Sequence, residues 1–322
     1  MERCEEKTRR TSQDGRVGQE GKSSRELFQM RVAVIGFGTM GRQIAQVFAQ
    51  HGSEVAVTDE NPVAVKSGLD EVAHGLYGVE SAVAKAKITR EEGEKTLQKI
   101  RPTADVRDAC HDADLVIEAV YENLPLKQEL FAKLESIAPQ SALLASNTST
   151  LTVSKIGSRL SKKDRLLGMH FFNPAQITKL VEIVKTDQTS ERAIQETVKI
   201  VETIGKTPII AHDEPGFIAN RLGLTLYMEA SALLEEGTTK IRDIDLAMKL
   251  GYNHPMGPFE LADFVGLDTR LRNLEALFQA TGDEKWIPPK ALREMVNRGY
   301  LGDPSRRKGS KGGYHEFFGS TR

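Results

Sequence analysis

Short apolar runs rich in β-branched residues alternate with helix-like segments from residue 30 to about residue 214. Such runs are typical of buried strands in a parallel sheet. They occupy residues 31–35, 55–58, 115–120, 142–145, 166–169, 180–184 and 208–211. Between them, apolar residues recur every three or four positions, as at Met40, Ile44 and Val47, which predicts amphipathic helices. The alternation predicts βαβ units, and region 62–100 is predicted to form two successive helices, the second beginning at Thr89.

The strand-like runs stop near Pro215, and only helix-like segments follow. These segments cover residues 217–236, 241–250, 259–264 and 267–280. We therefore predict an α/β domain at 30–214, with a Rossmann-type doubly wound and mostly parallel sheet, followed by an all-helical C-terminal domain at 215–318. Residues 1–29 are polar and are predicted to be a disordered leader, and residues 319–322 a short tail.

The first helical segment carries more apolar positions than one small domain face needs. These positions are Ile218, Leu222, Leu224, Leu226 and Met228. The excess predicts a homodimer through the helical domain.

Composition narrows the function mainly by exclusion. The 322 residues carry a formal net charge of −1, which argues against a basic surface for nucleic acid. No apolar run approaches the roughly 20 residues that cross a bilayer, so we expect no membrane partner. The leader lacks the apolar core of a secretory signal and is too acidic for a mitochondrial transit peptide. Cys4 and Cys110 are the two cysteines, and no metal-ligand spacing occurs, so we expect a reducing, cytoplasmic setting and no metal.

A glycine-rich turn joins the run at 31–35 to the helix that follows. Its G-x-G-x-x-G motif consists of Gly36, Phe37, Gly38, Thr39, Met40 and Gly41. In a dinucleotide fold these glycines permit the tight turn, the approach of backbone to the pyrophosphate, and close helix–strand packing. Asp59 ends the next strand, where a carboxylate binds the ribose hydroxyls, and the adjacent Glu60 would repel a 2′-phosphate. The motif therefore predicts NAD rather than NADP.

His170 directly follows the run at 166–169, so we expect it at the carboxyl edge of the sheet, where ligands bind in doubly wound folds. Histidine has a pKa near neutrality, which suits a base that removes a hydroxyl proton while hydride passes to NAD. Glu182 lies on the next run and can orient His170, which would also avoid an unpaired buried carboxylate. We therefore predict a histidine–glutamate acid/base pair.

Further motifs follow the glycine turn in a fixed order. They are EAVYEN at 118–123, SNTS at 146–149, HFFNP at 170–174, PGFIANR at 215–221 and GPFELAD at 257–263. Together they resemble the 3-hydroxyacyl-CoA dehydrogenase family, close to its bacterial 3-hydroxybutyryl-CoA dehydrogenases, from residue 30 to residue 318. The resemblance implies NAD-dependent oxidation of a (3S)-3-hydroxyacyl-CoA, of short chain such as 3-hydroxybutyryl-CoA, to the 3-oxoacyl-CoA, and the reverse reaction.

The resemblance also implies roles for individual residues. His170 would be the general base in oxidation and the general acid in the reverse reaction, with Glu182 as its orienting carboxylate. Ser149 and Asn220 would hold the substrate hydroxyl and thioester region. The nicotinamide half of the cofactor site would be lined by Glu122, Lys127, Ser149 and Asn173, and Lys308 would reach the cofactor from the tail. Taken alone, Ser149 and Asn173 also suit turns or caps, and Lys127 suits a solvated helix face.

Two segments depart from the family pattern. Residues 74–81, where the family usually supplies groups to the coenzyme A phosphates, are glycine-rich and lysine-poor, although Lys66, Lys85 and Lys87 lie nearby. The tail at 308–314 lacks the usual phenylalanine before the tyrosine. The first departure keeps open a hydroxyacid dehydrogenase that does not use coenzyme A. A non-catalytic NAD-binding protein is the other alternative, but binding alone would need neither His170 nor Glu182.

Overall fold

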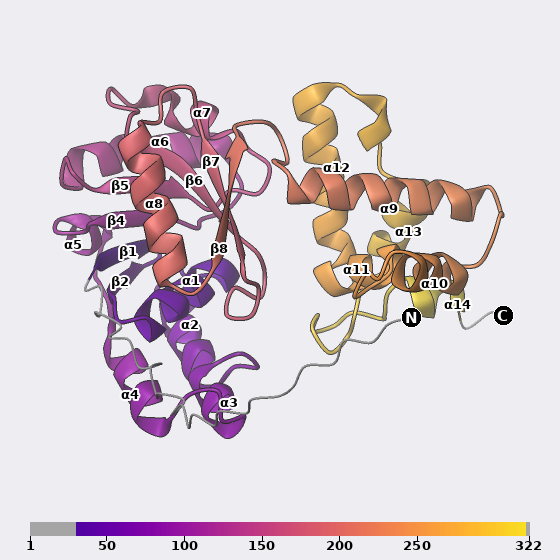
Figure 1. Ribbon diagram of the computed structural model, residues 1–322, viewed down its shortest axis with the longest axis horizontal. Coiled ribbons are helices and arrows are strands. Elements are labelled where there is room, and N and C mark those ends of the chain that lie inside the picture. The colour runs from indigo at the N-terminus through magenta and orange to yellow at the C-terminus, as the bar shows by residue number, and fades with distance from the viewer. Residues whose placement is uncertain (1–29, 320–322) are drawn as a thin grey trace, which may run out of the picture.

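The computed structural model describes residues 30–319 as an α/β part and a helical part, joined by the chain that leads into α9 (Ala219–Glu235) (Figure 1). The predicted leader at 1–29 lies outside the described residues, as do residues 320–322 of the predicted tail. Within residues 30–319, no helix combines the length and the apolar character that a membrane span requires.

A single eight-stranded sheet forms the centre of the α/β part. Its strands are β1 (Arg31–Ile35), β2 (Glu54–Thr58), β3 (Ile100–Pro102), β4 (Leu115–Glu118), β5 (Leu143–Ser146), β6 (Leu166–Phe171), β7 (Leu180–Lys185) and β8 (Thr207–His212). They lie in the order β3-β2-β1-β4-β5-β6-β7-β8, and every pair is parallel except β6 and β7. The predicted doubly wound, mostly parallel fold is therefore confirmed.

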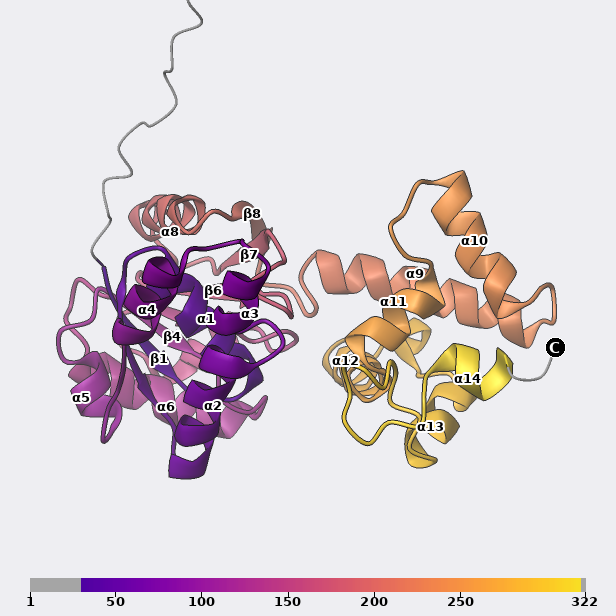
Figure 2. The same ribbon diagram turned by 90° about the horizontal axis from the view of Figure 1, so that it is seen from below.

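Each face of the sheet has its own hydrophobic core, because successive strand residues point to opposite faces. Val34 of β1 shares one core with Phe48 of α1 (Thr39–Gln50), whereas the neighbouring Ile35 shares the other with Phe131 of α6 (Leu124–Ile137). The first core also takes residues of α8 (Glu191–Thr203), and the second takes residues of α5 (Val106–Cys110) and α7 (Val153–Ile156). Figure 2 shows α8 and α5 on opposite sides of the sheet.

Region 62–100 differs from its prediction. It forms α2 (Pro62–His74), α3 (Val79–Ala84) and α4 (Arg90–Gln98), one helix more than predicted, and the short strand β3 that follows was not predicted. The chain turns at Gly75, where a Cβ would lie 2.4 Å from the Glu71 carbonyl oxygen. Thr89 begins α4 as predicted, because its hydroxyl accepts a hydrogen bond from the backbone N–H of Glu92 at 3.2 Å.

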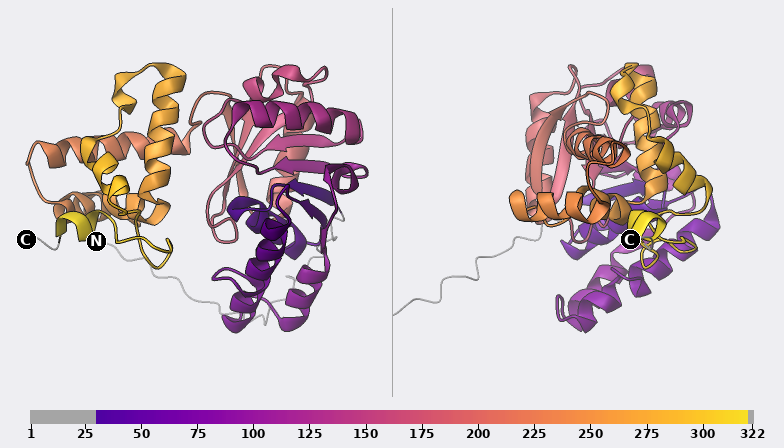
Figure 3. Two further views of the ribbon diagram at one scale, coloured as in Figure 1. Left: turned by 180° about the vertical axis from the view of Figure 1, so that it is seen from behind. Right: turned by 90° about the vertical axis from the view of Figure 1, so that its right-hand side faces the viewer.

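The helical part packs around a cluster of aromatic side chains. Its remaining helices are α10 (Ile241–Gly251), α11 (Pro258–Val265), α12 (Leu267–Thr281), α13 (Lys290–Asn297) and α14 (Tyr314–Gly319). The rings of Phe259 and Tyr314 lie 4.5 Å apart, and Tyr227 of α9 meets Tyr314 at 6.0 Å. Asp263 accepts a hydrogen bond from the Tyr314 N–H at 2.8 Å, which fixes the tail to α11. The sequence pattern missed α13 and α14. Figure 3 shows that this part stands beside the α/β part.

Candidate active site

The glycine turn lies between the end of β1 and the start of α1. Gly36 has φ +91°, a conformation that suits glycine, and its N–H donates to the Thr58 carbonyl at 2.9 Å. A Cβ on Gly41 would lie 1.9 Å from the Gly36 carbonyl oxygen, so only glycine allows this helix to pack so closely on the turn. Gly38 is different, since a Cβ there would meet no protein atom within 4 Å. Its space is open for a ligand.

A cavity of about 720 Å³ opens beside this turn, and we call it the glycine-loop cavity. Gly36, Gly38 and Asp59 line it. The Asp59 carboxylate accepts hydrogen bonds from the N–H groups of Phe37 at 2.7 Å and Asn61 at 2.9 Å, so it also holds the turn. Among the described residues that line the cavity there is no arginine for a 2′-phosphate; Glu60 and Asp105 add two carboxylates to Asp59, and Lys133 is the one cation. These groups fit the adenosine half of NAD.

His170 and Glu182 form a buried pair. His170 Nδ1 lies 2.7 Å from Glu182 Oε2, and the two residues are 4% and 0% exposed. The other Glu182 oxygen accepts hydrogen bonds from the N–H groups of Ile218 at 3.1 Å and Ala219 at 2.8 Å, at the start of α9. Desolvation raises the pKa of Glu182, but the hydrogen bonds from His170 and Ala219 outweigh it and hold the pKa below its usual value. Glu182 is therefore an ionised partner for the imidazole.

Ser149 and Asn220 are brought together across the two parts of the molecule. The Asn220 side-chain amide donates to the Ser149 carbonyl at 3.2 Å. Asn147, on the same loop as Ser149, accepts a hydrogen bond from the Phe171 N–H at 2.9 Å, next to His170. The sequence reasoning gave Asn147 no role. Its amide connects the His170 strand to the Ser149 loop.

A second cavity, of about 350 Å³, lies between the α/β part and α12, and we call it the interdomain cavity. Its lining consists of Met40, Ala119, Val120, Glu122, Asn147, Ser149, Thr150, Thr269, Arg272, Asn273 and Ala276. Ala119 and Val120 also line the glycine-loop cavity, so the two cavities share a wall just after the end of β4. His170 and Asn220 are not among the lining residues. The contributions of α12 were not predicted, since the sequence pattern does not say which helix covers the site.

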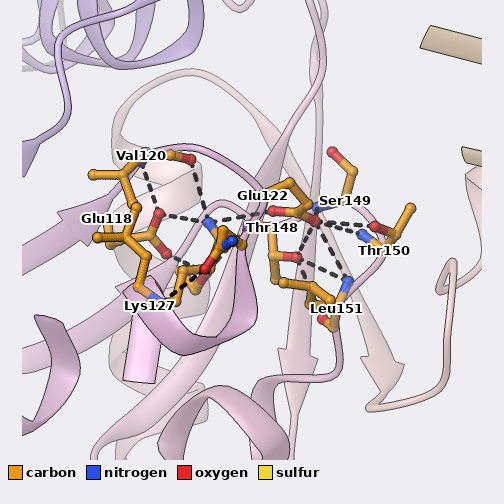
Figure 4. Close-up of polar contacts among 11 residues, drawn as sticks. Glu118, Val120, Glu122, Lys127, Thr148, Ser149, Thr150 and Leu151 are labelled. Atoms are coloured by element: carbon orange, nitrogen blue, oxygen red, sulfur yellow. Dashed lines mark hydrogen bonds and ion pairs between the residues drawn. The ribbon is translucent and has the colours of Figure 1, made fainter. Parts of the chain in front are cut away.

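Lys127 is fully buried, with 1% of its side chain exposed, so its interpretation as a solvated helix residue is wrong. Its ammonium lies 2.6 Å from Glu118 and 3.2 Å from Glu122 (Figure 4). Glu122 in turn accepts hydrogen bonds from the loop 148–151, including the Thr148 hydroxyl at 2.5 Å and the Ser149 N–H at 3.1 Å. Glu122 lines the interdomain cavity, whereas Lys127 lies behind it.

Asn173 and Lys308 line a third cavity, of about 370 Å³, which we call the tail cavity. Asn173 accepts a hydrogen bond from Gln43 of α1 at 3.0 Å. Arg42, Tyr77 and Arg306 also line this cavity, and the Arg306 guanidinium donates to the Tyr77 hydroxyl at 2.6 Å. Lys66, Lys85 and Lys87 are not among its lining residues. The structure thus separates Asn173 and Lys308 from the cavity that Glu122 and Ser149 line.

Two family models match consecutive parts of the chain. The NAD-binding domain of 3-hydroxyacyl-CoA dehydrogenase matches residues 31–214, and the C-terminal domain of the same enzyme matches residues 216–312. A probable 3-hydroxybutyryl-CoA dehydrogenase of Bacillus subtilis is 40% identical over 277 residues, which cover 86% of this chain and 95% of the relative. The mitochondrial hydroxyacyl-coenzyme A dehydrogenase of Sus scrofa is 42% identical over 290 residues, with 87% and 90% covered.

A solved structure shows the same similarity. The (S)-3-hydroxybutyryl-CoA dehydrogenase PaaH1 of Ralstonia eutropha has a TM-score of 0.79 and 37% sequence identity, and the match covers 88% of this chain and 99% of that one. The similarity therefore extends over both parts of the molecule.

Proposed function

Because the chain belongs to the 3-hydroxyacyl-CoA dehydrogenase family, whose members use NAD, we propose that it oxidises a short-chain (3S)-3-hydroxyacyl-CoA such as 3-hydroxybutyryl-CoA. The product is the 3-oxoacyl-CoA, and the reverse reduction uses the same residues. The observation that carries this proposal is the buried His170–Glu182 pair in a dinucleotide fold.

His170 is the proposed general base. An ionised Glu182 can only accept a hydrogen bond, so His170 Nδ1 carries the hydrogen and Nε2 keeps its lone pair. In oxidation Nε2 takes the hydroxyl proton as the C3–H bond breaks, and in reduction it returns a proton to the 3-oxo oxygen. NAD, when bound, supplies the hydride acceptor. Glu182 keeps the imidazole in this tautomer and stabilises the imidazolium that forms.

The substrate hydroxyl and thioester region are the proposed ligands of Ser149 and Asn220, which already touch each other across the domains. We assign the adenosine half of NAD to the glycine turn and Asp59, and the nicotinamide half to the interdomain cavity with Glu122 and Ser149. Lys127 acts through Glu122 rather than by contact with the cofactor.

The tail cavity supports a coenzyme A thioester over a free hydroxyacid. Arg42, Arg306 and Lys308 line it, and cations of this kind favour phosphate groups. These three cations come from α1 and the tail, whereas the stretch 74–81 contains no lysine or arginine. We propose that they bind the phosphates in its place. Lys308 and Asn173 would then serve the coenzyme A side of the site.

The test of the proposed function is NADH absorbance with two substrates. We expect rapid NADH formation from (3S)-3-hydroxybutyryl-CoA and NAD, and very little from free 3-hydroxybutyrate. Equal turnover of the free acid would favour a hydroxyacid dehydrogenase that does not use coenzyme A. No turnover of either compound, or of acetoacetyl-CoA with NADH in the reverse direction, would favour a non-catalytic NAD-binding protein.

We further propose a homodimer through the helical domain, with domain limits at 30–214 and 215–318. Leu222 and Ile218, near the start of α9, are 67% and 38% exposed, whereas Leu224 is buried in the helical core. A second copy covering the exposed pair would remove them from water. We expect a dimeric mass in solution and a shift toward monomer in Leu222→Glu; a monomeric wild type would contradict the proposal.

A further inference from the structure

Three ionisable side chains form a cluster at the interdomain cavity: Glu122 lines the cavity, and Glu118 and Lys127 lie behind it. The Lys127 ammonium lies between two carboxylates, 2.6 Å from Glu118 and 3.2 Å from Glu122 (Figure 4). We call these three residues the carboxylate triad. With both glutamates ionised, the triad has a net charge of −1.

Both carboxylates accept hydrogen bonds from several donors. Glu118 is 0% exposed and accepts from Lys127, from the Val120 N–H at 2.8 Å and from the Ser146 hydroxyl at 2.7 Å. Each Glu118 oxygen therefore accepts at least one hydrogen bond. Glu122 accepts from the loop 148–151. Desolvation raises the pKa of Glu122, but Lys127 and the Thr148 hydroxyl outweigh it and leave the pKa below its usual value.

The triad lies at the half of the site where the reactive ring of the cofactor belongs. A dinucleotide spans the point where the strand order reverses, with one half on each side. The glycine turn and Asp59 serve the β1–β2 side, so the other half extends past Ala119 and Val120 into the interdomain cavity. Glu122 lines this cavity, and Glu118 closes the strand that leads into it.

The opposite wall of the cavity carries one cation, Arg272, which does not neutralise the net negative charge of the triad. Arg272 of α12 is paired with Asp268 at 3.0 Å and has 65% of its side chain exposed. Water screens a charge in that position more strongly than it screens Glu122, whose side chain is 37% exposed, or the buried Glu118 and Lys127. The net charge of the groups at the cavity's inner wall therefore stays negative.

We propose that the carboxylate triad makes the site discriminate between the two redox states of its cofactor. The nicotinamide ring is positively charged in NAD⁺ and neutral in NADH, because hydride transfer adds two electrons and one proton to it. A net negative charge beside the ring lowers the free energy of the oxidised form relative to the reduced form. Bound NADH then becomes a stronger hydride donor, and NADH leaves more readily after substrate oxidation. This property goes beyond the proposed substrate and does not depend on it.

Equilibrium binding tests the proposal without catalysis. The dissociation constants of NADH and NAD⁺ are measured for the full-length protein by NADH fluorescence, with NAD⁺ as the competitor. In Glu118→Gln and Glu122→Gln we expect the ratio of the NADH to the NAD⁺ dissociation constant to fall by about tenfold. A purely structural role would weaken both forms equally and leave the ratio unchanged.

Glu129→Gln is the matched control, because it removes the same charge from an exposed position on α6, the helix that carries Lys127. We expect this variant to keep the wild-type ratio within twofold. An unchanged ratio in both triad variants, or an equal change in the control, overturns the proposal. If Glu118→Gln does not fold, Glu122→Gln decides alone, since its side chain is 37% exposed and is not part of the hydrophobic core. Loss of 3-hydroxyacyl-CoA turnover would not bear on this ratio, so failure of the proposed function is distinguishable.

Discussion

His170 and Glu182 are register partners in the antiparallel pair of β6 and β7, and His170 Nδ1 lies 2.7 Å from Glu182 Oε2. Directly opposed residues in an antiparallel pair present their side chains on the same face. A shift of one residue would send the carboxylate to the other face of the sheet. The reversal of strand direction at β7 therefore brings His170 and Glu182 together, and Glu182 extends the contact to the start of α9.

His170→Ala should lower kcat by at least about a hundredfold, since general-base catalysis contributes roughly 10²–10⁴ in rate. The NAD dissociation constant should stay near its wild-type value, because the glycine turn and Asp59 are untouched. Steady-state kinetics and NAD binding, measured on the same preparation, check both. Wild-type turnover by this variant would remove the histidine from the mechanism.

Gly38→Ala and Gly41→Ala should fail in different ways. A Cβ at Gly38 meets no protein atom, so the fold should keep its melting temperature while NAD binding weakens at least about tenfold, because the methyl group occupies cofactor space. A Cβ at Gly41 would lie 1.9 Å from a backbone oxygen, so that variant should lose stability. Thermal unfolding and NAD titration of both variants provide the comparison. Normal NAD affinity in Gly38→Ala would mean that the pyrophosphate does not lie against Gly38.

Asp59→Ala should weaken NAD binding by about ten- to a hundredfold, which corresponds to the loss of a hydrogen bond to a charged group. The change also removes the acceptor for the Phe37 N–H, so part of the effect will come from a looser turn. Glu60→Ala, at the exposed neighbouring position, is the control and should change the affinity far less. Equal effects of the two substitutions would argue against a specific ribose contact.

The helical part should lose stability as pH rises from about 4 to about 7. Burial raises the pKa of Asp263 to about 6, above its unfolded value of 3.8, so the folded state binds the proton more tightly. Proton binding by Asp263 therefore stabilises the folded state. This contribution is complete below pH 3.8 and is lost as pH rises through about 6. The upper limit is about 3 kcal/mol.

Asp263→Asn isolates this effect, because asparagine does not titrate. The free energy of unfolding of the wild type should therefore fall relative to that of the variant as pH rises. Trp286, the single tryptophan, is buried in the helical core, so its fluorescence follows unfolding of this part. Asp243→Asn, at an exposed position of α10, is the control for a general charge effect. A pH-independent difference between wild type and Asp263→Asn would contradict the assignment.

Local pattern was enough to predict much of the fold and cofactor site. The Gly36–Gly41 turn and Asp59 belong to one βαβ unit, in which each residue is placed by its near neighbours along the chain. The family, the NAD assignment and the fold class are confirmed. The sequence pattern missed the strand β3, because three residues at a sheet edge carry too little periodicity. It also missed the break between α2 and α3 at Gly75 and Gly78.

The remaining features depended on contacts between distant residues. The sequence left Lys127 either a cofactor-site residue or a solvated helix residue, because its ion pair with Glu118 forms only when α6 packs against the sheet. Arg306 meets Tyr77 across 229 positions, and no pattern connects them.

By itself, the order of apolar runs and motifs determined every strand of the sheet except β3, the glycine turn and the residue types available for chemistry. Only the tertiary structure decided which side chains share a cavity, that Lys127 stands behind Glu122, and that α12 covers the site. The physical reason is one of range. Strand and turn propensities act between neighbours, whereas burial and ion pairing depend on how the whole chain packs.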